Sequence, residues 1–63
     1  MLKVRFRFGI KEAWLGTDFD KWDKTIFEYR QVNTPRLLVQ ISFLDGYKVQ
    51  TRICDLVLVE EAK

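Results

Sequence analysis

The residues of this sequence best suited to recognition chemistry lie together in one short segment. Two tryptophans and three aspartates fall within ten residues of each other: Trp14, Asp18, Asp20, Trp22 and Asp23. Large aromatic side chains surrounded by charge are typical anchors of protein interfaces. We therefore predict that these five residues bind a protein partner. The alternative, that the tryptophans belong to the core, remains open for both Trp14 and Trp22.

The same aspartates partly match the spacing of a calcium-binding loop. Asp18, Asp20 and Asp23 supply carboxylates, but Trp22 stands at the fifth ligand position and neither a glycine nor a distant glutamate completes the pattern. We therefore expect a solvated acidic rim, with no metal and no cofactor bound.

Basic residues suggest a second kind of partner. Near the start of the chain, apolar residues alternate with Lys3, Arg5 and Arg7. Near its end, Lys48 and Arg52 occupy alternate positions of a second predicted strand, on the same face as Gln50. On the outward faces of two strands these side chains could contact phosphate groups, which makes nucleic-acid binding the alternative function. The competing explanation is that charged residues protect exposed strands from aggregation. The net charge of +2 is too small to choose between them.

The composition removes the common catalytic sites. The chain has no histidine, one cysteine (Cys54) and one serine (Ser42). A Ser-His-Asp or Cys-His arrangement therefore cannot form within one copy, nor can a zinc site of cysteine and histidine. We expect a protein that is not an enzyme, in which Cys54 packs as a small apolar residue.

Length and hydrophobicity indicate one small folded domain over residues 1–63. Hydrophobic residues make up 48% of the chain, which argues against disorder. The longest apolar run, 56–59, is far shorter than the roughly 20 residues of a membrane span. The charged N-terminal pattern does not resemble a signal peptide, and a lone cysteine suits a reducing compartment. We expect a cytoplasmic protein with no membrane contact.

Alternation of apolar and polar residues predicts the strands that position these side chains. It is clearest over residues 2–8, where Gly9 marks the end, and over residues 37–43 and 47–53. The last two segments read as a hairpin. A three-residue loop, 44–46, makes one face apolar by pairing Phe43 with Tyr47 and Ile41 with Val49, whereas a two-residue loop leaves neither face apolar. Such a loop requires a positive φ at Gly46.

Residues 9–32 are harder to assign. We predict a long loop over 9–24 with a short helical turn near 18–22, followed by a strand over 25–32 that β-branched and aromatic residues favour. The alternative is a helix that starts from a Thr17 cap and places Phe19, Trp22, Ile26 and Tyr29 along one side.

Together these segments predict a mainly β fold: a strand, a long first loop, three meandering strands, a tight corner and a closing strand over 56–59. This order, the short third turn and the ending Arg-Ile-Cys-Asp-Leu-Val-Leu-Val, residues 52–59, resemble the five-stranded SH3-like small barrel. Signalling SH3 domains carry an Ala-Leu-Tyr-Asp-Tyr motif, a tryptophan at the third strand and a proline in the corner, which this sequence lacks. The resemblance therefore implies a fold without proline-motif binding. Free-standing barrels of this size also resemble accessory proteins of phages or mobile elements.

Overall fold

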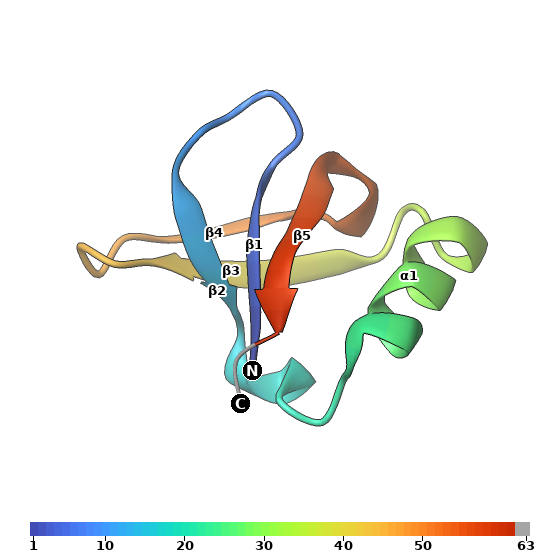
Figure 1. Cartoon of the computed structure of the whole chain (residues 1–63). Helices are drawn as coiled ribbons and strands as arrows, with labels where there is room; N and C mark the ends of the chain where they lie inside the picture. The colour runs from blue at the N-terminus through green and yellow to red at the C-terminus, as the bar shows by residue number, and fades with distance from the viewer. Residues whose placement is uncertain (62–63) are drawn as a thin grey trace.

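The protein is mainly β, with one five-stranded antiparallel sheet and one short α-helix (Figure 1). A computed structural model describes residues 1–61, so residues 62 and 63 of the predicted single domain lie outside the described residues. In chain order the elements are β1 (Leu2–Phe6), β2 (Glu12–Leu15), the 3₁₀ helix η1 (Thr17–Phe19), α1 (Lys24–Asn33), β3 (Leu38–Phe43), β4 (Lys48–Arg52), the 3₁₀ helix η2 (Ile53–Asp55) and β5 (Leu56–Glu61). The strands lie in the order β4-β3-β2-β1-β5. Strands β4 and β5 are thus the edges of an open sheet.

Strand β1 confirms the alternation seen at the start of the chain. Leu2 and Val4 are buried, while Lys3 and Arg5 alternate with them and lie on the outer face. The prediction was wrong at the end of the strand: β1 stops at Phe6, and Phe8 lies in the turn that follows, 97% exposed instead of on the buried face.

The predicted long loop is wrong in its middle part, because it contains β2. Ala13 and Leu15 are buried and alternate with Glu12 and Trp14, so the segment has the period of a strand over only four residues. Strand β2 pairs with β1 on one side and β3 on the other. The expected helical turn is present as η1, slightly earlier in the chain than predicted.

The strand predicted over residues 25–32 is also wrong, because this segment forms α1. The alternative helix was correct in kind, but it starts from an Asp23 cap and not from Thr17: the Asp23 carboxylate accepts a hydrogen bond of 2.9 Å from the Ile26 N–H. Its buried face also differs, since Phe27 is buried while Ile26 and Tyr29 are exposed. A residue that caps the helix outweighs the weak β preference of the side chains that follow.

The β3–β4 hairpin has the predicted register. Ile41 lies opposite Val49. The Phe43 N–H donates to the Tyr47 carbonyl over 2.8 Å. Gly46 has a φ of +91°, which glycine adopts without the steric cost of a Cβ atom. The turn therefore fixes which side chains of both strands face the core.

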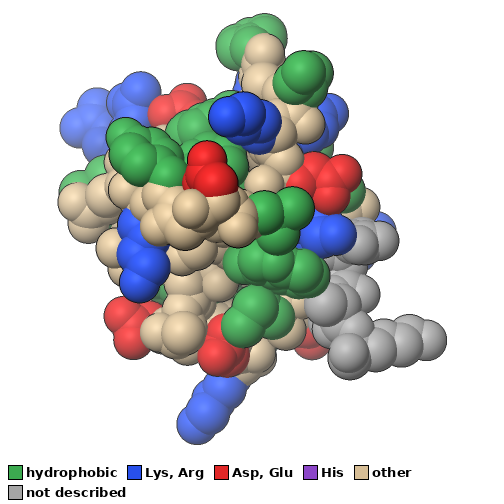
Figure 2. All heavy atoms as spheres, turned by 90° about the vertical axis from the view of Figure 1, so that its left-hand side faces the viewer, with side chains coloured by type: hydrophobic (Ala, Val, Ile, Leu, Met, Phe, Trp, Pro, Cys, Tyr) green, Lys and Arg blue, Asp and Glu red, His purple; other side chains and the backbone are tan. Residues whose placement is uncertain are grey.

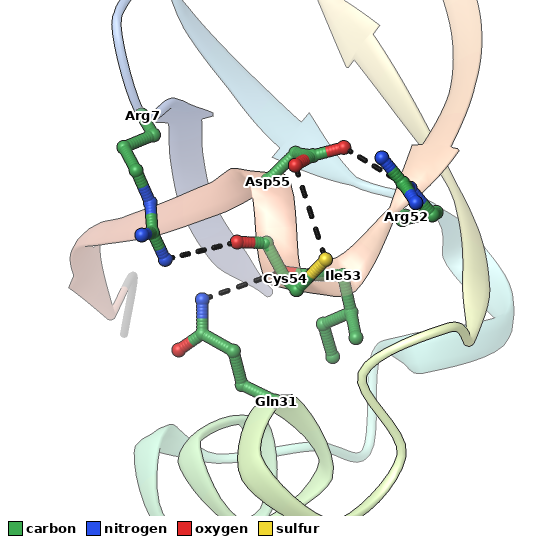
Figure 3. Close-up of polar contacts among 6 residues, drawn as sticks. All are labelled: Arg7, Gln31, Arg52, Ile53, Cys54 and Asp55. Carbon is green, nitrogen blue, oxygen red and sulfur yellow. Dashed lines mark hydrogen bonds and ion pairs between the residues drawn. The ribbon is translucent and has the colours of Figure 1, made fainter.

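The closing corner and last strand are also confirmed. Residues 53–55 form η2, and β5 then pairs with β1. Helix α1 lies beside this corner, where Gln31 Nε2 donates to the Ile53 carbonyl (Figure 3). The same Nε2 also donates to the Leu56 carbonyl.

The core lies between the inner face of the sheet, α1 and the corner. Its fully buried members are Leu2, Val4, Ala13, Leu15, Phe27, Val39, Ile41, Ile53 and Leu56. Phe27 is the only buried residue of α1, so it is the side chain by which the helix enters the core.

Candidate binding surfaces

The two tryptophans lie on opposite sides of the sheet. Trp14 projects from β2 between two buried residues, so it faces outward, and the Lys3 ammonium lies 4.9 Å from the centre of its ring. Trp22 packs edge-on against Phe19, with ring centroids 4.4 Å apart, and both rings pack against the core. Trp14 and Trp22 therefore do not form one recognition surface.

The three aspartates of this segment also differ in their surroundings. Asp23 caps α1, so its carboxylate already accepts a backbone hydrogen bond. Asp18 and Asp20 are exposed in and just after η1. The described side chains include no group of three or more aspartate, glutamate, cysteine or histidine residues that could hold a metal ion.

Four of the five predicted basic residues lie on the outer sheet face together with Trp14. The strand register places Lys48, Ser42, Trp14 and Lys3 in one row across β4, β3, β2 and β1. Arg5 lies beside this row, and Arg52 lies at the end of β4. The structure therefore gathers residues of both predicted sites on one face.

Most of these cations have partners within the chain. Lys3 Nζ lies 3.4 Å from a Glu12 carboxylate oxygen, and Arg52 Nε lies 3.4 Å from one of Asp55. Arg5 Nη1 donates to three carbonyl oxygens of the β1–β2 turn. Arg7 leaves the strand and donates to the Cys54 carbonyl over 3.0 Å (Figure 3). Much of the predicted basic surface thus also supports the fold.

Cys54 itself is half-buried in this corner. Its Sγ lies 3.8 Å from an Asp55 carboxylate oxygen, which is a weak contact for a thiol (Figure 3).

A third surface was not predicted from the sequence. Two turns carry large apolar side chains that are almost fully in solvent: Phe8 is 97% and Ile10 is 94% exposed in the β1–β2 turn, and Leu44 is 79% and Tyr47 is 63% exposed in the β3–β4 turn. Figure 2 presents the left-hand side of Figure 1, and hydrophobic side chains lie at the top of this face and in a band below. We call these four residues the loop-end surface.

A hollow lies between the two turns. Its volume is about 430 Å³, and it is lined by Ile10, Lys11, Glu12, Phe43, Leu44 and Asp45. Phe43, which lines the hollow, belongs to an aromatic series: its ring centroid lies 6.2 Å from that of Phe6 and 6.0 Å from that of Tyr47, on which it stacks. The sequence signal was present: apolar residues occupy turn positions where polar ones are usual.

Comparison of the chain with protein-family models, curated proteins and solved structures finds no match. Among the described residues, no helix has the length and apolar character needed to cross a bilayer. The candidate surfaces must therefore be weighed on their own geometry.

Proposed function

We propose that this chain is a non-enzymatic binding module of SH3-like architecture that recognises a protein partner. The strand order supports the architecture, because β1 lies between β2 and β5 and a 3₁₀ corner leads into β5. The absence of histidine from the sequence and its single cysteine and serine support a non-catalytic role.

The observation that carries the proposal is the exposure of the loop-end surface. Four large apolar side chains held in water by two short turns cost hydration free energy that a partner would recover. The hollow between Ile10 and Leu44 has the size of a ligand pocket. Lys11 lies exposed on its rim. We propose that the partner inserts an apolar side chain here and places a carboxylate near Lys11. That Asp18 and Asp20 also contact the protein partner stays a prediction from the sequence.

The test compares what two surface variants capture. Ile10→Ser with Leu44→Ser removes apolar groups from both turns, and Val32→Ser removes one of similar exposure, 77%, from α1. Because all three residues are exposed, we expect unchanged circular dichroism and melting temperature. A partner captured from lysate by the wild type should be retained by Val32→Ser and lost by the double variant. Equal capture by both variants would contradict the proposal.

Nucleic-acid binding is the second candidate, and the row that contains Trp14 favours it. An aromatic side chain between two lysines on a sheet face can stack on a base while the lysines contact phosphates. Binding of a single-stranded oligonucleotide should then quench tryptophan fluorescence, weaken with salt and weaken in Trp14→Ala. Unchanged fluorescence at low salt would exclude this function.

A further inference from the structure

The two edges of the sheet are finished differently. On β5, the Leu56 carbonyl points away from β1, and α1 meets it with the Gln31 amide. Among the described residues, β4 pairs only with β3, and no side chain donates to its outer edge. The helix thus meets the start of the β5 edge, whereas no side chain of the described residues meets the β4 edge.

The hydrogen bonds at its two ends show which backbone groups β4 leaves free. The Phe43 N–H donates to Tyr47 and the Ile53 N–H donates to Leu37, each over 2.8 Å. Bonded and non-bonded pairs alternate in an antiparallel ladder, so Val49 and Thr51 also bond to β3. The N–H and C=O groups of Lys48 and Gln50 therefore point away from the sheet.

The side chains of β4 also leave room for a neighbour. Val49 and Thr51 face inward but are only half-buried, whereas their partners Ile41 and Val39 are buried. Tyr47, just before the strand, is mostly exposed. An added strand would cover the inner side chains and complete the apolar face.

The charges of β4 select the strand that could be added. Two copies paired about Gln50 would place Lys48 opposite Arg52, and like charges directly opposite each other are unfavourable. A strand with carboxylates at these positions would form two favourable cross-strand pairs instead. Lys48 is exposed and forms no ion pair within the described residues, and the pair of Arg52 with Asp55 is solvent-exposed.

We propose that β4 is a strand-addition site for an extended peptide that alternates acidic and apolar residues and runs antiparallel to β4. The carboxylates pair with Lys48 and Arg52 on the outer face. The apolar residues cover Val49 and Thr51 on the inner face. This site meets the loop-end surface only at Tyr47, and its backbone and charge contacts do not depend on the function proposed for that surface.

The probe is the synthetic peptide acetyl-Glu-Val-Thr-Val-Glu-Leu-amide, whose central threonine lies opposite Gln50. Titration followed by amide NMR should shift the signals of β4 and slow the hydrogen exchange of the Lys48 and Gln50 amides, which the free protein exposes. The matched peptide with lysine in place of glutamate should bind about tenfold more weakly. Lys48→Glu should reduce or reverse this preference.

Two further controls test the backbone pairing itself. N-methylation of the peptide threonine removes an amide that faces β4 and should abolish binding, whereas N-methylation of the valine after it, which faces solvent, should not. Gln50→Pro removes an outward N–H that β3 does not use and should block binding with the fold intact. If this variant fails to fold, the comparison of the two N-methylated peptides tests the backbone pairing instead.

Three results would overturn the proposal. They are no shift at millimolar acidic peptide, equal binding of the two methylated peptides, and shifts confined to the β1–β2 turn. The Ile10→Ser, Leu44→Ser variant should bind the peptide as the wild type does, so failure of the loop-end proposal is distinguishable from failure of this one.

Discussion

Replacing Phe27 with alanine tests whether α1 is held to the sheet as the structure shows. Its side chain is 0% exposed, so the full transfer free energy of the ring, about 1.5–3 kcal/mol, is lost. The cavity left between helix and sheet raises the expected loss to about 3–5 kcal/mol. A chain of 63 residues has a total stability of about 3–9 kcal/mol. Phe27→Ala should therefore remove between a third and all of the free energy of unfolding.

The assay is urea unfolding followed by tryptophan fluorescence, with Trp22 reporting on the core through its contact with Phe19. Phe8→Ala is the matched control, because the same ring is lost from a site that is 97% exposed, and its stability should change by less than about 0.5 kcal/mol. The reasoning is refuted if Phe27→Ala loses less than about 1 kcal/mol, or if the two variants lose equal amounts.

Three further substitutions separate local causes of stability by the same unfolding assay. Gly46→Ala should cost about 1–2 kcal/mol by backbone strain alone, since an added Cβ would meet no atom within 4 Å, and a neutral result would argue against the positive φ. Gly16→Ala should instead clash, because its Cβ would lie 2.8 Å from the Gln40 carbonyl oxygen, and faster exchange of the residue 16 amide should report the weakened β2–β3 pairing. Asp23→Ala should lower the free energy of unfolding by about 1 kcal/mol and weaken the helical circular-dichroism signal, because the cap of α1 is lost. An unchanged helix signal would show that the cap is dispensable.

The hairpin was predictable because all its determinants lie within 17 residues of sequence, 37–53. Only one loop length places Ile41 and Val49 on the same face, and Gly46 stands where that loop requires a positive φ. The alternation of side chains between the two faces and the residue type at the turn are independent signals, and both indicate the same three-residue loop.

Helix α1 was not predictable in the same way, because its apolar pattern does not match its burial. Ile26, Tyr29 and Val32 are exposed, although their residue types suggest a buried face. The helix depends on contacts distant in sequence: Phe27 enters the core, and Gln31, one turn later on the same side, reaches the corner at Ile53. Only the Asp23 cap was visible locally, and aspartate is common before many kinds of turn.

The binding residues show a different limit of sequence reasoning. Residue type indicates what a side chain can do, but the fold decides whether it is available. Arg5 and Arg7 could bind phosphate, yet both donate to carbonyl oxygens that would otherwise lack these bonds, so a phosphate must compete with the fold for them. The loop-end side chains and the outer backbone groups of β4 face no such competition, because the described residues leave them to solvent. The apolar and backbone contacts proposed at either surface therefore add to the existing contacts without replacing any, whereas a carboxylate that pairs with Arg52 must compete with Asp55 for that guanidinium.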